Sequence, residues 1–172
     1  MSEYIALMRG VNVGGRIIKM ADLKTCFEHT GLKNVRTVLQ SGNVLFESPA
    51  SDGSVLRQNI ETAVTKQFKY PAIVFVYSQA DMLQMVELCP FEDSDKNFHT
   101  YLVLLEPGVG EELIKEPFKL AKNEQVSLGK NVIYWRVSKG MTLKSEFSKY
   151  LSKSKYKDFN TNRNLNTIKK LI

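Results

Sequence analysis

The order in which apolar residues switch between strand-like and helix-like spacing restricts the fold of this chain more than any other feature. Residues 3–9 are apolar almost throughout, as expected of a strand that is covered on both faces or lies centrally in a sheet. In residues 20–30 the apolar positions lie three or four apart, which predicts a helix that stops at Gly31. Residues 35–40 and 43–48 are typical of two strands, and the "SG" between them predicts a two-residue hairpin turn.

A second helix and a fourth strand complete this pattern. Ser51, Asp52 and Ser54 are possible N-caps of a helix whose apolar positions continue to Phe68, because such side chains accept the first free backbone N–H groups of a helix. Residues 72–77, "AIVFVY", form a continuous apolar strand. The order strand, helix, strand, strand, helix, strand is the ferredoxin-like βαββαβ pattern of an α+β fold with an antiparallel sheet.

The second half of the chain begins the same order again after a linker helix expected at about residues 79–88. We interpret this as a structural duplication without obvious sequence identity. The second unit has no clear last strand, and residues 161–172 are instead typical of a capped terminal helix. The other expected elements are a strand at 99–105, a helix at 110–122, a hairpin at 125–137 that turns at Gly129 and Lys130, and a helix marked by Leu143, Phe147, Tyr150 and Leu151.

Two tandem ferredoxin-like units are therefore predicted, packed together as one compact protein. A chain of 172 residues is long enough to bury the core that such an arrangement needs. The first unit is residues 1–78 and carries a glycine-rich loop. The second is residues 79–172, with the linker helix, a βαββα unit and a basic C-terminal helical segment.

The link between the first strand and the first helix, "MRGVNVGGRIIKM" (residues 8–20), contains three glycines, one asparagine and two arginines. In an antiparallel sheet of the predicted order the first and second strands run the same way, so this loop is expected beside the turn at residues 41–43. Glycine-rich loops and helix N-termini attract anions through their unpaired backbone N–H groups. The sequence therefore predicts an anion site formed by Arg9, Gly10, Asn12, Gly14, Gly15, Lys19, Ser41, Gly42 and Asn43.

The glycine spacing does not match a nucleotide-binding fingerprint. Gly10, Gly14 and Gly15 do not form the G-x-G-x-x-G pattern of dinucleotide-binding proteins. Gly10 and Gly15 have the spacing of a phosphate-binding P-loop, but Arg16 and Ile17 occupy the positions that require Lys and Ser or Thr. Because isoleucine cannot bind magnesium, a triphosphate hydrolase is disfavoured.

A second polar cluster, "TNRNLNT" (residues 161–167), lies near the end of the sequence. Short amides and hydroxyls around one arginine can cap a helix and satisfy loop carbonyls. The functional alternative is that Arg163, Asn164 and Asn166 form the opposite wall of the same pocket. A structural alternative applies to the first cluster as well, with glycines that shape the turn and asparagines that hydrogen-bond it internally.

The basic character of the chain belongs to its C-terminal fifth. The formal charge is +6, but residues 1–135 contain 14 Lys and Arg against 16 Asp and Glu, whereas residues 136–172 contain 10 against 2. This asymmetry indicates an anionic partner, either nucleic acid or phosphate, and the alternative is a solvated lysine-rich helix face. The first and third strands carry only Tyr4 and Phe46 as aromatic residues, so binding of RNA would be chiefly electrostatic.

Four motifs together carry a family resemblance: "YIALMRGVNVGG", "KMADL", "NVRTVLQSGNVLFES", and "TNRNLNT" followed by "IKKL". Over essentially its full length the chain resembles the bacterial family known as domain of unknown function 1697. The family pattern usually has a tryptophan where this chain has Leu165, which argues against a stacking role there. The resemblance implies no established activity, but it implies that one set of residues works together, namely Arg9, Gly10, Asn12, Gly14, Gly15, Ser41, Gly42, Asn43, Arg163 and Asn164.

These residues favour a binding module for a phosphate-bearing or other anionic ligand, either a nucleotide or a nucleic-acid backbone. The first alternative is an enzyme that acts on a small phosphorylated or carboxylated substrate, with Arg9 and Arg163 as clamps. It lacks an evident pair of nucleophile and base, since Ser41 is the only plausible nucleophile. The second alternative is a structural or protein-interaction role, in which both arginines belong to the scaffold.

No cofactor and no metal are expected, because Cys26, Cys89, His29 and His99 lie far apart in the sequence. The composition, 43% hydrophobic and 24% charged, is that of an ordinary globular protein. The N-terminus lacks the pattern of a secretory signal, and no apolar run reaches the roughly 20 residues that span a bilayer. We therefore expect a cytoplasmic protein without membrane association, whose partners are an anionic small molecule or nucleic acid. The sequence does not identify a protein partner.

Overall fold

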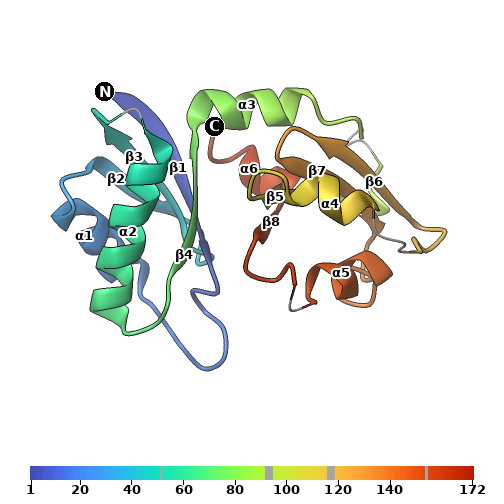
Figure 1. The fold of residues 1–172 in the computed structure, drawn as a ribbon, viewed down its shortest axis with the longest axis horizontal. Helices are drawn as coiled ribbons and strands as arrows, with labels where there is room; N and C mark the ends of the chain where they lie inside the picture. Colours follow the sequence, from blue (N-terminus) through green and yellow to red (C-terminus); the bar gives the residue numbers. More distant parts are fainter. Residues whose placement is uncertain (51, 92–94, 116–118, 154) are drawn as a thin grey trace. The chain divides into compact units, whose positions relative to one another are not determined.

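The computed structural model describes residues 1–50, 52–91, 95–115, 119–153 and 155–172. These residues form an α+β protein with two four-stranded antiparallel sheets and six helices (Figure 1). The chain divides into two compact units. Unit 1 is Met1–Leu83 together with Lys170–Ile172, and unit 2 is Gln84–Lys169.

Unit 1 follows the predicted order of elements, β1, α1, β2, β3, α2 and β4. Its strands lie in the order β2-β3-β1-β4, so that β1 is central and pairs antiparallel with both β3 and β4. Helix α3 spans the division between the two units. The bounds are β1 Ser2–Arg9, α1 Met20–His29, β2 Lys33–Val38, β3 Asn43–Ser48, α2 Gly53–Phe68, β4 Ile73–Ser78 and α3 Gln79–Glu87.

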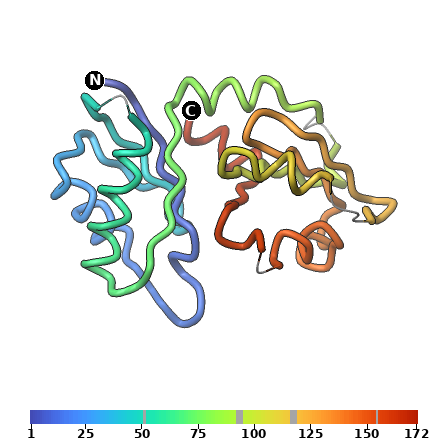
Figure 2. Tube along the Cα trace, viewed as in Figure 1, coloured from blue at the N-terminus to red at the C-terminus, as the bar shows by residue number. Residues whose placement is uncertain are grey.

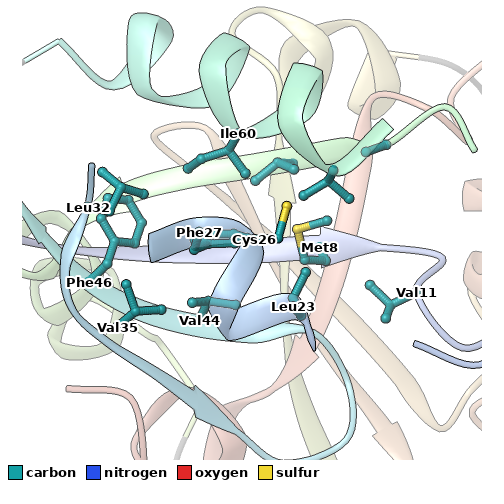
Figure 3. Close-up of a cluster of buried hydrophobic side chains, with 14 of the residues drawn as sticks. Met8, Val11, Leu23, Cys26, Phe27, Leu32, Val35, Val44, Phe46 and Ile60 are labelled. Carbon is teal, nitrogen blue, oxygen red and sulfur yellow. The ribbon is translucent and has the colours of Figure 1, made fainter. Parts of the chain in front are cut away.

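The core of unit 1 lies between its sheet and helices α1 and α2 (Figure 3). The apolar positions of both helices point toward this face of the sheet, as their spacing predicts. Tyr4 and Phe46 stack here with ring centres 5.6 Å apart, so these two strand aromatics are core residues. Strand β1 is buried from Tyr4 to Met8 without interruption, which means that both of its faces are covered. The helical core positions are Leu23, Cys26, Phe27, Leu56, Ile60 and Val64.

The turn between β2 and β3 is longer than the sequence pattern predicts. Val38 lies directly opposite Asn43 in the ladder, so the loop comprises the four residues from Leu39 to Gly42 and not the two residues "SG". The Asn43 side-chain amide donates to the Val38 carbonyl at 3.0 Å and to the Ser41 hydroxyl at 2.8 Å. These two bonds join the ends of the four-residue loop, and the dipeptide "SG" alone does not reveal them.

Helix α2 begins where one of the three proposed caps lies. The Asp52 carboxylate accepts a hydrogen bond from the backbone N–H of Ser54 at 2.8 Å. Ser51, another of the proposed caps, lies outside the described residues. Helix α1, in contrast, starts after Lys19 without a side-chain cap.

Unit 2 repeats the order strand, helix, strand, strand, helix, strand, and its strands lie in the order β6-β7-β5-β8. The prediction that the second unit lacks a last strand is wrong. Residues Asn160–Asn164 form β8, which pairs antiparallel with β5 through Leu102 and its neighbours. The bounds are β5 Phe98–Leu105, α4 Val109–Lys115, β6 Glu124–Gly129, β7 Val132–Ser138, α5 Glu146–Leu151, β8 Asn160–Asn164 and α6 Leu165–Ile168.

Strand β8 escapes sequence analysis because all five of its side chains are polar. Strand recognition depends on apolar alternation, whereas this edge strand is specified by its backbone pairing with β5. The predicted capped helix does follow it, since the Asn164 side chain accepts from the backbone N–H of Asn166 at 2.9 Å and caps α6. The polar cluster thus contributes most of strand β8, and its residue Asn164 caps helix α6.

Three further boundaries in unit 2 differ from expectation. Gly129 pairs with Val132, so the β6–β7 hairpin turns at Lys130 and Asn131, where Asn131 has φ of 56°. Helix α4 is described to Lys115, the expected residues 116–118 lie outside the described residues, and 119–122 are not helical. Leu143 is 88% exposed and precedes α5, because Ser145 caps that helix and sets its first turn.

The core of unit 2 is built on one face of its sheet by α4, α5 and the turns after α5. Trp135 lies at its centre, fully buried, with its ring 5.0 Å from that of Tyr101 and 5.6 Å from that of Phe147. Among the described residues no helix is both long enough and apolar enough to cross a bilayer.

Candidate functional site

The glycine-rich loop leaves the end of β1 and extends past the edge of the unit 1 sheet before it enters α1 (Figure 2). Gly10, Gly14 and Gly15 have φ of 64°, 61° and 81°, a left-handed conformation that other residues adopt only at a cost. A Cβ atom at Gly14 or Gly15 would meet nothing within 4 Å. These two glycines are therefore required by the direction of the backbone and not by crowding.

Arg16 fastens the loop to the body of unit 1. Its guanidinium donates to the Gly10 carbonyl at 3.1 Å and lies over the Tyr70 ring, 4.0 Å from the ring centre. The Tyr70 hydroxyl is buried and has no hydrogen-bond partner among the described residues. Burial raises the pKa of Tyr70, while the positive charge of Arg16 opposes that rise.

Asn12 ties the loop to the β2–β3 turn, as the predicted strand directions require. Its side-chain amide donates to the Gln40 carbonyl at 2.8 Å, and its side-chain oxygen accepts from the backbone N–H of Ile18 at 2.9 Å. The backbone N–H of Met8 donates to the Gly42 carbonyl at 2.8 Å. The loop and the turn thus lie side by side at one end of the sheet.

Gly42 lies where the β2–β3 turn approaches the glycine-rich loop and the end of β1 most closely. A Cβ atom built at this position would lie 2.7 Å from Met8 Cβ and 2.7 Å from Val11 Cγ2, and the φ of Gly42 is 69°. Asn43, next in the chain, is fully buried, whereas Ser41 is exposed. Of the predicted turn residues, Gly42 and Asn43 therefore shape the backbone, and Ser41 faces solvent.

The tip of the loop presents backbone donors. The exposed residues 12–15 donate no backbone hydrogen bond to any described residue, although the Val13 carbonyl accepts from Arg16 at 3.2 Å. Successive N–H groups next to left-handed residues form concave anion sites in many proteins. This stretch is the part of the predicted site that retains free hydrogen-bonding capacity.

The two predicted cationic side chains of unit 1 flank this loop in sequence. Arg9 is the last residue of β1, is half-buried and lies opposite Ile73. Lys19 is exposed and occupies the N-cap position of α1. Both sit where the loop joins a regular element, so that the loop carries positive charge at each end.

The predicted residues of the second cluster belong to unit 2. Arg163, in β8, donates to the Thr161 hydroxyl at 2.9 Å and to the Asn162 carbonyl at 2.8 Å. Asn164 caps α6, and Asn166 is exposed in its first turn. These contacts within the cluster match the structural alternative, in which the polar side chains satisfy backbone groups.

Sequence analysis missed two residues that organise these regions. In the sequence, Arg16 stands out only as a mismatch to the P-loop pattern. Its partner Tyr70 lies too far along the chain for a local sequence pattern to connect the two residues. Asn160 is buried, and its amide donates to the Tyr156 carbonyl at 2.7 Å, which ties β8 to the turns after α5. An asparagine at the start of a polar strand gives no sequence signal of burial.

A shallow groove lies at the other end of β2, lined by Lys24, Glu28, Asn34, Val35, Arg36 and Glu47. Several of its polar groups are already paired, since Lys24 and Glu28 are 3.7 Å apart and the Asn34 amide donates to Glu47 at 2.8 Å. The groove includes none of the predicted site residues. We therefore assign it no ligand.

Within the described parts of the chain, no group of three or more His, Cys, Asp or Glu residues is placed to hold a metal ion. Cys26 is a buried free thiol and Cys89 a half-buried one. Burial raises the pKa of the Cys26 thiol, which keeps it protonated at neutral pH and hence weakly nucleophilic.

The fold and the loop define an α+β protein of two units that share one strand order and differ in their loops. The chain belongs to the family described as protein of unknown function (DUF1697), which matches residues 1–134. The matched residues include the glycine-rich loop and the β2–β3 turn, and they end before β8.

The solved structure of a conserved bacterial protein from Streptococcus pneumoniae is similar to this chain, with a TM-score of 0.82 and 28% sequence identity. The similarity covers 99% of this chain and 96% of the other. No match to the chain is found among curated proteins.

Proposed function

We propose that this protein binds a phosphate-bearing or other anionic ligand, a nucleotide or a nucleic-acid backbone, at the glycine-rich loop and the adjoining turn. The observation that carries the proposal is the run of exposed backbone N–H groups at residues 12–15, which have no acceptor among the described residues. An anion that accepts several such bonds gains charge-assisted hydrogen bonds.

The loop is held in position before any ligand arrives. Arg16 anchors it through Gly10 and Tyr70, and Asn12 anchors it through Gln40. Preorganisation of this kind increases affinity because little conformational entropy remains to be lost on binding.

Cationic side chains complete the proposed site. Arg9 and Lys19 supply positive charge at the two ends of the loop, and Gly10, Gly14, Gly15, Gly42 and Asn43 shape its backbone. In the proposal Ser41 offers a hydroxyl to the ligand. Recognition of a phosphate by arginine is typically bidentate.

We place binding before catalysis because the sequence offers no evident pair of nucleophile and base, with Ser41 the only plausible nucleophile. Its hydroxyl accepts a hydrogen bond from the Asn43 amide at 2.8 Å, and an amide N–H cannot act as the general base that a serine nucleophile needs. An enzyme acting on a small phosphorylated or carboxylated substrate is therefore the second choice, and a scaffold role for the arginines is the third.

We further propose that each unit has the ferredoxin-like βαββαβ arrangement and that the protein works in the cytoplasm. The order of elements and the strand order of both sheets support the first part. The two free thiols, Cys26 and Cys89, support the cytoplasmic location, because reduced cysteines are typical of the cytoplasm.

Thermal unfolding at low salt in the presence of phosphate, pyrophosphate, nucleotides and sugar phosphates tests the proposal. A ligand at a hundred times its dissociation constant stabilises a protein by about 2.7 kcal/mol, which corresponds to roughly 5–10 °C for a protein of this size. We expect such a shift with at least one of these anions and expect Arg9→Ala to abolish it.

Arg36→Ala is the matched control, because Arg36 is exposed and lines the groove at the other end of β2. It should leave the shift unchanged. If Arg9→Ala lowers the melting temperature by several degrees and no anion shifts the parent protein, the arginine is part of the scaffold and the proposal is wrong.

A further inference from the structure

The stretch of unit 2 that follows β7 concentrates positive charge on its surface. We call the described residues 139–153 and 155–159 the lysine segment. It contains six lysines and only two acidic residues. All six lysines are exposed: Lys139, Lys144, Lys149, Lys153, Lys155 and Lys157.

The lysine segment is compact and anchored. Phe147, Tyr150 and Tyr156 are buried in the core of unit 2, and the described residues of the segment form helix α5 and short turns on either side of it. Backbone hydrogen bonds run from Lys153 to the Tyr150 carbonyl at 3.1 Å and from Lys157 to the Lys153 carbonyl at 3.0 Å. The lysines are therefore displayed on a structured surface, which distinguishes them from a basic tail.

Most of these charges lack an acidic partner. Lys149 pairs with Glu146 at 2.6 Å, but Lys139, Lys144, Lys153 and Lys157 form no ion pair with any described residue. Lys149, Lys153 and Lys157 follow one another at intervals of four residues. Lys153 and Lys157 lie outside α5, and both add exposed positive charge that no ion pair with a described acidic side chain neutralises.

The aromatic anchors also orient two of the lysines. The Lys153 ammonium lies 4.3 Å from the centre of the Tyr150 ring, and that of Lys155 lies 5.2 Å from the Tyr156 ring. Both ammonium groups thus lie over aromatic ring faces, while the two lysines remain exposed. Phe159, at the end of the lysine segment, is 49% exposed.

We propose that the lysine segment binds the phosphate backbone of single-stranded nucleic acid without sequence preference. Rows of lysines that neutralise phosphates supply most of such affinity, and an exposed aromatic ring such as that of Phe159 offers a face on which a base can stack. This surface consists of residues other than those of the proposed anion site, so either can exist without the other.

The burial of α5 favours nucleic acid over an anionic membrane. Helices that lie on membranes insert an apolar face below the lipid headgroups. In α5 that face consists of Phe147, Tyr150 and Leu151, and all three are buried in the protein. The helix therefore has no apolar face left to insert, and the positive charge of the lysine segment lies mainly outside it.

Fluorescence anisotropy with a labelled oligothymidine of about 20 nucleotides tests the proposal on the full chain. The variant Lys149→Gln, Lys153→Gln, Lys157→Gln removes three proposed phosphate contacts. The matched control is Lys33→Gln, Lys66→Gln, Lys130→Gln, which changes the net charge equally at exposed positions outside the lysine segment. Thermal unfolding of both variants verifies that they are folded.

For a single strand the slope of log Kobs against log salt is about −0.7 per neutralised phosphate. We expect the lysine-segment variant to lose about 2 in the magnitude of this slope and to bind roughly a hundredfold more weakly near 0.1 M salt. The control should keep the parent slope. A Phe159→Ala variant should weaken binding at every salt concentration without changing the slope.

Three outcomes would overturn the proposal. They are no binding of the oligonucleotide by the parent protein, an equal loss of affinity in both triple variants, and binding of anionic vesicles in preference to the oligonucleotide. The proposed anion site is tested separately, because the lysine-segment variant should keep any phosphate-induced thermal shift and Arg9→Ala should keep the oligonucleotide salt slope. Failure of one proposal is thereby distinguishable from failure of the other.

Discussion

The guanidinium of Arg16 lies 4.0 Å from the centre of the Tyr70 ring, and this stacking joins two residues that no local sequence pattern connects. One belongs to a glycine-rich loop and the other to the link between α2 and β4. The contact places a positive charge over the face of a buried aromatic ring. It also explains how a loop with three left-handed glycines keeps a defined position.

Replacement of Arg16 by methionine should raise the pKa of Tyr70 further. Burial raises this pKa and the charge of Arg16 lowers it, so that removing the charge leaves burial unopposed. The titration can be followed by NMR with tyrosine labelled at Cζ. A fall in the pKa would contradict this account, because it would mean that Tyr70 becomes solvated.

Replacement of Tyr70 by phenylalanine should leave stability unchanged or increase it. The hydroxyl is buried without a hydrogen-bond partner among the described residues, and a buried unsatisfied polar group costs about 1–3 kcal/mol. The phenylalanine ring can still stack under Arg16. Urea denaturation measures the free energy of unfolding. If the variant loses more than about 1 kcal/mol, the hydroxyl forms a stabilising hydrogen bond and this account is wrong.

Replacement of Gly42 by alanine should destabilise unit 1 by about 2–4 kcal/mol. A new Cβ would lie 2.7 Å from Met8 and from Val11, and such overpacking adds to the cost of a left-handed residue. Gly31→Ala is the control, because Gly31 has φ of 88° but open space around it, so only the cost of about 1–2 kcal/mol for the backbone remains. Equal losses in chemical denaturation would contradict the packing explanation.

Tyr134 should make the protein sensitive to alkali. Burial raises its pKa to about 12 from a model-compound value of 10.0, and its hydroxyl donates to the Met85 carbonyl at 2.8 Å. Because the folded protein holds this proton more tightly than the unfolded chain, the contribution is fully present below pH 10 and is lost as pH rises toward 12. The complete loss is on the order of 2–3 kcal/mol.

Tyr134→Phe provides the test. The variant should show a shallower decline in unfolding free energy between pH 10 and 12, measured by urea denaturation at each pH. Its stability at neutral pH should be lower by about 1 kcal/mol because the hydrogen bond is lost. A parallel decline in the two proteins would assign the alkaline sensitivity to other groups.

Replacement of Asn160 by alanine should destabilise unit 2 by about 1–3 kcal/mol, because two buried hydrogen bonds are lost, although the Tyr156 carbonyl keeps the Phe159 backbone N–H as a donor at 3.0 Å. The Asn160 amide donates to the Tyr156 carbonyl at 2.7 Å and to the Leu151 carbonyl at 3.4 Å. Asn162 lies two residues away on the same strand and is exposed, so Asn162→Ala should change stability by less than about 0.5 kcal/mol. Thermal unfolding distinguishes the two, and similar effects would argue against a specific role for the buried amide.

The elements of unit 1 could be predicted because their apolar spacing is clear. Strand β1, with five consecutive buried residues, and helix α1, with Leu23, Cys26 and Phe27 on one face, follow the periodicity rules directly. The end of the β2–β3 turn could not be predicted, because the side chain of Asn43 determines where the ladder closes. A hydrogen bond made by a single side chain does not produce a periodic pattern in the sequence, so periodicity cannot predict it.

Unit 2 was harder to predict for the same reason. Strand β8 consists of polar residues and is defined by its pairing with β5, while Leu143 has the right spacing for a helix that Ser145 starts later. In the candidate site, the proximity of the loop to the turn followed from strand direction alone. The anchoring of the loop by Arg16 and Tyr70 required the tertiary structure.

Lys170–Ile172 belong to unit 1 although all of unit 2 precedes them in the chain. Within this short segment Leu171 is buried, at 2% exposed, whereas Lys170 is exposed. A ribosome makes the chain from the N-terminus, and β1 to β4 therefore emerge long before the last piece of their own unit. Unit 1 can collapse early during translation, but it acquires its full set of contacts only after every residue of unit 2 has been synthesised.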